Sequence, residues 1–371
     1  MLFGRNWPVW VGGVAYGIIN VFLFIQFQPW TTLDGVLNWG NHIFGRFGIG
    51  NPDPLPALLR SGSVINFGLI FGAFLAALLA GQFGIRIGPK RELVKGGIGG
   101  LLMGTGAVLV RGCNIGGFFS GASSLSFHGL SMAAGLIIGA FLGARYLVWE
   151  VEKITASSTK TYLHNPRKQL YVGGIALVLA LAAVITYARL GYSSLAVILL
   201  FGILLGVVSQ RTRICFVRAF RDPFITGDST HTKAMLLALV ISIVGFMLVK
   251  FTFFEKVDAF VRPTFWQGSL VGGIIFGVGM VLASGCGGGT MWRAGEGHVK
   301  LWLALAGYIT AAAFMNDWLV TSGLINRLGD QVFLPDVIGW AWTFVLLMGI
   351  LALWFLLAQW NEMTRRLAAL Y

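Results

Sequence analysis

Residues 99–113 read GGLLMGTGAVLVRGC, and residues 272–286 repeat the pattern as GGIIFGVGMVLASGC. Glycine stands at the same five positions of both stretches, and each stretch ends in a cysteine. A third stretch, from Gly202 to Cys215, keeps two of those glycines and the cysteine in the same frame. The chain has three cysteines, so every thiol falls at the same point of a repeated unit. Self-similarity of this kind indicates an internal repeat.

The composition around these stretches is that of a membrane protein. Hydrophobic residues make up 56% of the chain and charged residues 11%, whereas soluble domains carry about 25% charged residues. Many apolar stretches reach the ~18 residues that cross a bilayer as a helix. The sequence therefore predicts an all-α, polytopic transmembrane helix bundle that sits in the lipid bilayer.

The hydropathy pattern predicts one integral membrane domain over residues 1–371, with internal repeats at approximately 64–148 and 194–321. The third and sixth of its ten predicted spans hold only about 16 residues, which is short for a full crossing. The spans are 9–27, 64–84, 96–111, 129–148, 170–188, 194–209, 234–254, 267–285, 301–321 and 338–358.

The net charge is +13, and the basic residues that produce it lie mainly between the predicted spans. Basic residues gather in 86–95, 145–168, 211–233 and 365–366, and ten crossings place all four clusters on one side of the membrane. Cytoplasmic loops carry the excess of Lys and Arg, so we expect both termini in the cytoplasm. The charge thus encodes orientation and does not indicate nucleic-acid binding.

The two closest copies of the repeat run in opposite directions under this topology. The unit 96–143 runs from inside to outside, and its partner 271–314 runs from outside to inside. Inverted repeats of this kind build many transporters, whose sites lie at the repeat interface near the membrane midplane. A further unit, at Gly68 and Gly72, carries Gly81 where the others carry cysteine.

Each cysteine is followed by a segment too polar or too rich in glycine to face lipid. Backbone that is not helical at membrane depth is tolerated where protein buries it or where it lines a water-filled cavity. We therefore expect broken or re-entrant helices that meet at a central cavity. The segments are 113–128, 215–233 and 286–300.

The thiols themselves are the candidate substrate pathway: Cys113, Cys215 and Cys286. A thiol is a weak, soft donor that suits a sulfur or selenium atom, whereas phosphate or sulfate calls for arginine or lysine. The alternatives are that the cysteines pack as small hydrophobes, or that one becomes a nucleophilic thiolate beside an arginine.

Polar and charged residues near the thiols are candidate supporting residues. They either form local ion pairs that hold the broken segments in shape or attract an anion, and the pairs Arg221 with Asp222 and Arg293 with Glu296 favour the first reading. The full set is Arg111, Asn114, Arg221, Asp222, Arg293 and Glu296.

Other chemistry has little support in the sequence. The cysteines are not spaced as a zinc pair, and no disulfide set fits three of them. No phosphate-binding G-x-x-x-x-G-K-[ST] motif occurs, and no nucleophile stands with triad partners. We expect no metal, no cofactor, no catalytic residue and no enzymatic activity.

The cysteine segments resemble those of the YeeE/YedE family of sulfur-compound transporters. The arrangement is most similar to the YedE branch, which is linked to selenium metabolism, while other branches take up thiosulfate. The sequence departs from the thiosulfate branch where Gln26 stands nine residues after Gly17. The resemblance rests on RGCNIGGFF (111–119), on SQRTRICF (209–216) with AFRD (219–222), and on GCGGGTMWRAGEG (285–297).

This resemblance implies a carrier of the bacterial inner membrane whose cysteines pass a thiosulfate ion along a narrow path. It also implies small TusA-like sulfur-carrier proteins in the cytoplasm as partners. Thiosulfate uptake is the leading hypothesis, and a selenium compound such as selenite is the alternative within transport. From another class, the chain would be a membrane sulfurtransferase that passes sulfur from a cysteine persulfide.

Overall fold

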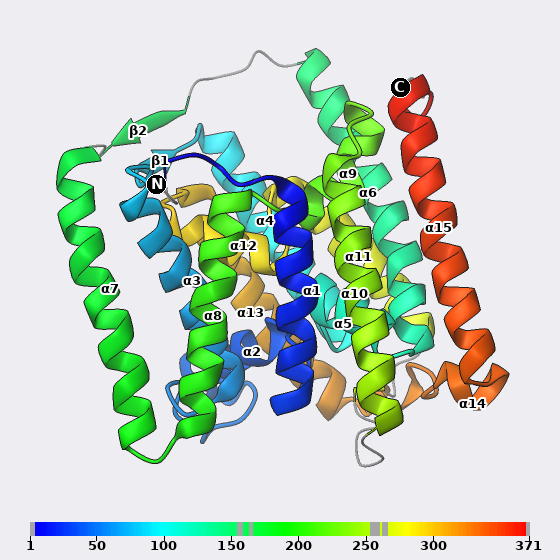
Figure 1. The fold of residues 1–371 in the computed structure, drawn as a ribbon, viewed down its shortest axis with the longest axis horizontal. Coiled ribbons are helices and arrows are strands. Elements are labelled where there is room, and N and C mark those ends of the chain that lie inside the picture. The colour runs from blue at the N-terminus through cyan, green and yellow to red at the C-terminus, as the bar shows by residue number, and fades with distance from the viewer. Residues whose placement is uncertain (1–3, 154–158, 163–165, 253–259, 262–265, 369–371) are drawn as a thin grey trace.

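The computed structural model describes residues 4–153, 159–162, 166–252, 260–261 and 266–368. Within them, ten helical segments are long and apolar enough to cross a membrane, by length and composition. The prediction of an all-α, multi-pass membrane bundle is confirmed. The long helices lie side by side, and both chain ends lie at the same end of the bundle (Figure 1).

The described elements are helices, apart from two short strands. In chain order they are α1 (Val9–Gln26), α2 (Leu33–Phe44), η1 (Gly45–Phe47), α3 (Ser61–Leu79), β1 (Ile85–Ile87), α4 (Lys90–Val110), η2 (Asn114–Phe119, a π-helix), α5 (Ser120–Ser123), α6 (Phe127–Lys153), β2 (Lys160–Tyr162), α7 (Pro166–Arg189), α8 (Ser193–Thr212), α9 (Phe216–Ile225), α10 (Thr230–Thr252), α11 (Trp266–Ala283), α12 (Gly287–Gly295), α13 (Val299–Thr321), η4 (Leu324–Arg327), α14 (Leu334–Ile338) and α15 (Trp340–Thr364).

Two features differ from the sequence-based expectation. The third and sixth spans are not short, because α4 has 21 residues and α8 has 20. Helix α4 begins six residues earlier than predicted, at Lys90, since a charged first turn can reach the interface while the helix continues. The loop 28–63 contains α2, an amphipathic helix that buries Leu33 and Val36.

Glycines bring α4 and α11 into backbone contact. A methyl group on Gly99 would lie 2.6 Å from the carbonyl oxygen of Gly279, and one on Gly279 would lie 2.7 Å from that of Gly99. Gly106 and Gly272 face each other in the same way: a methyl group on Gly106 would lie 2.5 Å from the carbonyl oxygen of Gly272, and one on Gly272 would lie 2.7 Å from that of Gly106. Gly99 and Gly272 are equivalent positions of the two copies, as are Gly106 and Gly279. Reciprocal contacts of this kind are what a twofold relation produces, and the division into two inverted repeats stays a prediction.

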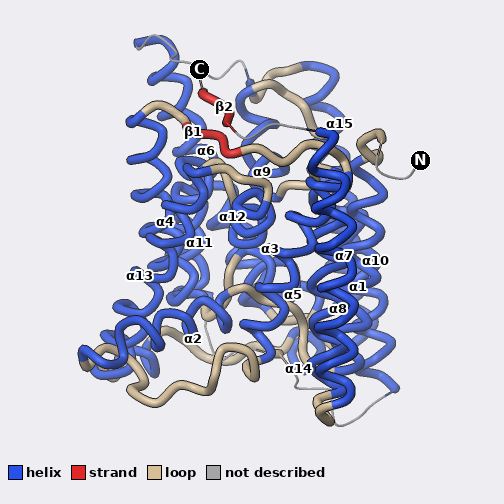
Figure 2. Tube along the Cα trace, turned by 90° about the vertical axis from the view of Figure 1, so that its left-hand side faces the viewer, coloured by secondary structure: helices blue, strands red, loops and turns tan. Residues whose placement is uncertain are grey.

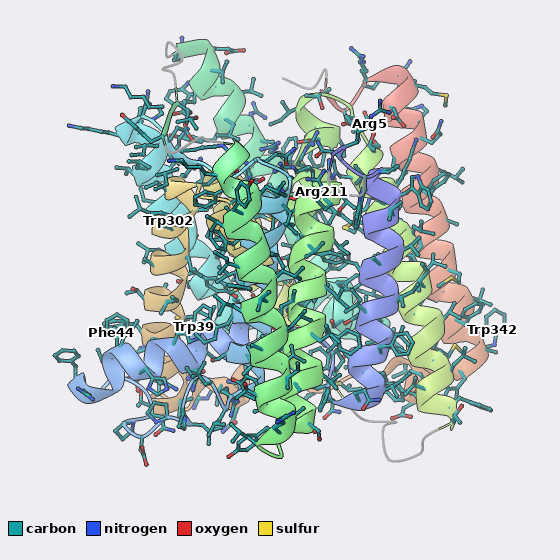
Figure 3. The ribbon with its side chains drawn as sticks, turned by 60° about the vertical axis from the view of Figure 1, so that its left-hand side comes forward. Arg5, Trp39, Phe44, Arg211, Trp302 and Trp342 are labelled. Carbon is teal, nitrogen blue, oxygen red and sulfur yellow. The ribbon has the colours of Figure 1, made fainter. Side chains whose placement is uncertain are left out.

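The short helices α5 and α12 lie among the long helices (Figure 2). Helix α12 packs against α3 and α13, and α9 packs against α6 and α10. Helices α7 and α15 stand at the two edges (Figure 1). Near the termini, β1 pairs with β2 in antiparallel register, Ile85 opposite Tyr162. Arg5 and Arg211 lie at that end, and Trp39 and Phe44 of α2 lie at the other (Figure 3).

Candidate functional site

The three cysteine segments break their helices with the same local geometry. The residue after α4, α8 and α11 has a left-handed φ of 60°, 57° and 61°, respectively. Two residues later the backbone is extended at a cysteine, which is the N-cap of the next element, η2, α9 or α12. Left-handed backbone at a non-glycine residue costs about 1–3 kcal/mol and clusters at functional sites. These left-handed residues are Arg111, Arg213 and Ser284.

All three thiols meet at the first turn of α12. A methyl group on Gly287 would lie 3.3 Å from Sγ of Cys113. One on Gly289 would lie 3.1 Å from Sγ of Cys286 and 3.9 Å from Sγ of Cys215. All three are free cysteines and buried. The predicted pathway residues are therefore brought together, although they lie far apart in the sequence.

Backbone amides donate hydrogen bonds to two of these sulfur atoms. The amide of Gly289 donates to Sγ of Cys286 at 3.2 Å, and the amide of Thr32 donates to Sγ of Cys113 at 3.5 Å. The predicted supporting residue Asn114 accepts from the amide of Gly287 through Oδ1 at 3.1 Å. Because the thiols of Cys113 and Cys286 accept hydrogen bonds from the backbone, their S–H groups are left to donate to an anion.

A fourth helix, α2, also begins at the thiol cluster, and its N-cap is a threonine. Thr32 is the N-cap of α2, the position that the cysteines hold at the other three breaks, and its hydroxyl lies 3.3 Å from that of Tyr308. Gln26, which the glycine spacing singled out, is the last residue of α1 and is exposed. One sequence signal could have identified Thr32: a hydroxyl residue two positions before Asp34 is typical of the start of a helix.

The site favours an anion by its electrostatics. Helices α2, α9 and α12 begin at the thiol cluster, and helix N-termini carry partial positive charge. Within the described residues, Asn114 Nδ2 and Thr290 Oγ1 are buried without a hydrogen-bond partner. Buried polar atoms of this kind are normally satisfied, so both are suited to contact a bound ligand.

A cavity approaches the cluster from the end opposite the termini. Its volume is about 250 Å³, and it reaches Thr31, whose hydroxyl lies 3.9 Å from Sγ of Cys113. Arg60 pairs with Asp34, which lines the cavity. Further lining residues are Gln28, Trp30, Ser61 and Gly62.

Toward the termini, α12 ends in a buried carboxylate. Glu296 is fully buried, and its oxygens lie 2.6 and 2.7 Å from Nη1 of Arg213. Burial alone would raise the pKa of Glu296, but hydrogen bonds from His298, Arg213 and Gln210 and the charge of Arg213 lower it to about 2. Burial lowers the pKa of His298, so at neutral pH the carboxylate is ionised and the imidazole is neutral.

The predicted supporting residues divide into two groups. Asn114 lies in the thiol cluster, and Arg111 forms the backbone break before Cys113. Arg221 pairs with Asp222 at 2.7 Å as expected, farther along α9. The expected ion pair between Arg293 and Glu296 is replaced by other contacts of both side chains.

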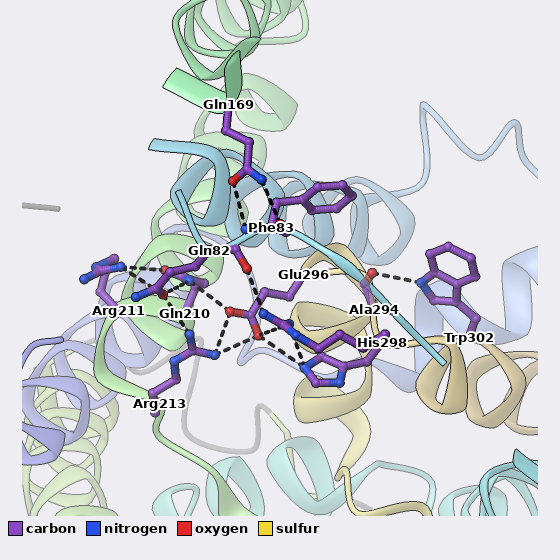
Figure 4. A network of polar contacts seen from close by, with 11 residues as sticks. Gln82, Phe83, Gln169, Gln210, Arg211, Arg213, Ala294, Glu296, His298 and Trp302 are labelled. Atoms are coloured by element: carbon purple, nitrogen blue, oxygen red, sulfur yellow. Dashed lines mark hydrogen bonds and ion pairs between the residues drawn. The ribbon is translucent and has the colours of Figure 1, made fainter. Parts of the chain in front are cut away.

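Arg293 donates instead to the backbone oxygen of Ser284 at 2.7 Å, and Glu296 is held by Arg213. Sequence reasoning missed Gln82 and Gln210, which complete this network (Figure 4). In the described part of the chain, no group of three or more His, Cys, Asp or Glu side chains is placed to hold a metal ion.

A family model described as sulphur transport matches residues 1–142 and 211–369. The chain belongs to this family. The resemblance of the cysteine segments to YeeE/YedE proteins is therefore confirmed, and the protein is a multi-pass member of a membrane transporter family.

Curated relatives within the sulphur transport family fall under two names. The chain is 29% identical to "Probable transporter YedE" of Escherichia coli K12, over 81% of this chain and 79% of that protein. It is also 29% identical to the protein of that name from Salmonella typhimurium LT2, over 88% and 85% of the two chains. "Thiosulfate transporter TsuA" of Escherichia coli K12 is 40% identical over 32% of this chain and 33% of its own length.

Proposed function

We propose that this protein takes up a sulfur-containing anion, thiosulfate, along a path lined by Cys113, Cys215 and Cys286. The observation that carries the proposal is the meeting of the three thiols at the first turn of α12. A thiol suits the soft terminal sulfur of thiosulfate. The relative named as a thiosulfate transporter, which aligns over a third of this chain, supports the same substrate.

The path begins at the cavity near Thr31 and continues past Cys113 to Cys286 and Cys215. A doubly charged anion that enters it loses hydration, at an effective cost of several kcal/mol. The N-termini of α2, α9 and α12 offset part of that cost with positive potential. Thiol contacts are individually weak, and conduction needs sites that the ion can leave.

A selenium compound such as selenite is the alternative substrate. The relatives that cover most of the chain are named only as probable transporters, so their names favour no substrate. A path that recognises a soft atom by thiols accepts selenium as well as sulfur. Competition by selenite against labelled thiosulfate uptake distinguishes a shared path from a selective one.

A membrane sulfurtransferase is the alternative from another class. It would hold sulfane sulfur as a persulfide on one cysteine and pass it to a carrier protein. After incubation with thiosulfate, a persulfide adds the mass of one sulfur atom to a cysteine peptide. A transporter accumulates whole substrate and leaves the three cysteine peptides unmodified, which is the result we expect.

The orientation we propose places both termini in the cytoplasm of a bacterium, with the protein in its inner membrane. Both chain ends lie at one end of the bundle (Figure 1), together with the basic loops around β1 and α9. A small TusA-like sulfur carrier is the partner we propose for that face.

A cysteine added after Tyr371 tests this orientation in a chain whose three native cysteines are alanine. We expect a membrane-impermeant maleimide to leave it unlabelled in intact spheroplasts and to label it after lysis. The replacement Asp53→Cys, at an exposed position between α2 and α3, serves as the positive control from outside. Efficient labelling at the C-terminus of intact spheroplasts would reverse the topology.

The transport proposal is tested by growth. A strain without sulfate and thiosulfate uptake should grow on thiosulfate as its sole sulfur source when it expresses this chain. Radiolabelled thiosulfate should accumulate in the same cells at a rate above that of the empty vector. Growth on cysteine is the viability control, and no gain on thiosulfate with normal membrane abundance would exclude thiosulfate uptake.

A further inference from the structure

The C-terminal end of α12 carries a cluster of charged groups around a buried carboxylate, which the thiol path does not use. The carboxylate of Glu296 is held by Nη1 of Arg213 at 2.6 and 2.7 Å and by Nε2 of Gln210, which donates at 3.0 Å. Nη1 of Arg86 lies 3.8 Å away. Figure 4 shows Gln210, Arg213 and His298 converging on the carboxylate of Glu296.

Positive charge exceeds negative charge in this cluster. Arg213 and Arg293 stand against the indole of Trp292, at 5.7 and 5.9 Å from the ring centre. Arg211 donates to Oε1 of Gln210 at 3.3 Å. Two guanidinium groups, those of Arg213 and Arg86, therefore share the one carboxylate of Glu296, while Arg293 and Arg211 add positive charge nearby. The side chains of Arg213 and Arg86 are 31% and 25% exposed, so an anion that arrives from solvent can reach them.

The cluster lies next to the thiols on the way to the termini. Helix α12 begins after Cys286 and ends at Gly295, before Glu296, which is about 14 Å at the rise of an α-helix. Arg213 stands two residues before Cys215. An anion that leaves the thiols toward the termini therefore meets these guanidinium groups within one short helix.

We propose that Arg213, Gln210 and Arg86 form an oxyanion-binding site whose ligand position is filled by the Glu296 carboxylate in this structure. A free oxyanion takes the place of that carboxylate. Guanidinium and amide N–H groups bind the oxygens of sulfate-like ions, whereas the thiols suit a soft sulfur. The direction of travel rests on the proposed function, but the site itself does not.

Glu296 acts in this proposal as a tethered competitor. A group tethered beside its site competes at an effective concentration in the millimolar range or above. Removing its charge should therefore tighten the binding of a free oxyanion by about tenfold or more. The replacement Glu296→Gln keeps the size of the side chain but removes its charge, so a free oxyanion displaces the neutral side chain from the arginines at lower cost.

The experiment uses sulfate as the probe and the full chain purified in detergent. The unfolding temperature is measured against sodium sulfate, with sodium chloride at equal ionic strength as the reference. We expect the apparent Kd for sulfate to fall about tenfold in Glu296→Gln. The gain should vanish in the double variant Glu296→Gln with Arg213→Gln. Glu92→Gln is the matched control, because Glu92 pairs with Lys95 and Lys300 at the same end of the bundle.

Equal sulfate affinity in the parent and Glu296→Gln would overturn the proposal, as would an equal gain in Glu92→Gln. If Glu296→Gln does not fold, Glu296→Asp replaces it, because the shorter carboxylate competes less well; an unchanged Kd there also contradicts the site. Sulfate has no soft terminal sulfur, so this measurement stands even if the thiols prove irrelevant to transport.

Discussion

Replacing Cys286 by alanine should reduce thiosulfate uptake by roughly ten- to hundredfold, the effect of losing a hydrogen bond to a charged group. Cys286 faces the same small space in front of Gly289 as Cys215, so its S–H is placed to contact an ion between them. Uptake of radiolabelled thiosulfate, normalised to membrane abundance, is the measurement. We expect losses of the same order for Cys113→Ala and Cys215→Ala.

Serine at position 286 separates the chemistry of the thiol from its structural role. Cys286 also caps α12 by accepting from the amide of Gly289, and serine is a better N-cap than alanine by about 1 kcal/mol. Cys286→Ser should therefore keep the stability of the parent while restoring uptake only in part, because a hydroxyl is a harder partner. Full uptake in Cys286→Ser would assign the cysteine to capping alone. Parental uptake in all three alanine variants would exclude the thiol relay.

The breaks in the helices could be predicted because their cause is local. A span that ends in Gly-Cys followed by GGGT or NIGG cannot continue as a lipid-facing helix. The structure places the break at the same offset in each case, with the left-handed residue two positions before the cysteine. The glycine frame also anticipated close helix packing, since Gly99 and Gly279 leave no room for a side chain.

The partners of Glu296 could not be predicted in this way. Arg213 lies 83 residues from Glu296 and Gln210 lies 86 residues away, so only the fold brings them together. The sequence favoured Arg293, three positions before Glu296, as the local choice. That side chain turns back to cap the broken end of α11 through the Ser284 carbonyl. Local spacing therefore identified the charged segment and assigned its ion pair wrongly.

The segment between α1 and α2 is a further position that local spacing failed to predict. Counting nine residues from Gly17 leads to Gln26, which ends α1 and faces outward. The chain instead runs on to Thr32 before the next helix starts, so the cap arrives six residues later than the glycine frame predicts. What the four breaks share is the N-cap beside the cluster and not the distance from the preceding glycine.

Replacing Gly289 by alanine should abolish most uptake while leaving the fold intact. The added methyl group would lie 3.1 Å from Sγ of Cys286 and 3.9 Å from Sγ of Cys215, in the space that the substrate needs. The amide of residue 289 still donates to Cys286, so the cap is retained. The 3.1 Å contact requires the Cys286 thiol to shift slightly, and the higher helix propensity of alanine, about 1 kcal/mol, offsets that cost, so the unfolding temperature should stay close to that of the parent.

A gain or no change in stability together with a loss of uptake is a result that simple misfolding cannot produce. We expect the loss to match that of Cys286→Ala, about tenfold or more, because both remove the contact between substrate and thiol. Gly97→Ala is the matched control, since Gly97 lies in α4 with nothing within 4 Å of an added methyl group. If Gly289→Ala takes up thiosulfate as fast as Gly97→Ala, the ion does not pass between Cys286 and Cys215, and the path must be placed elsewhere.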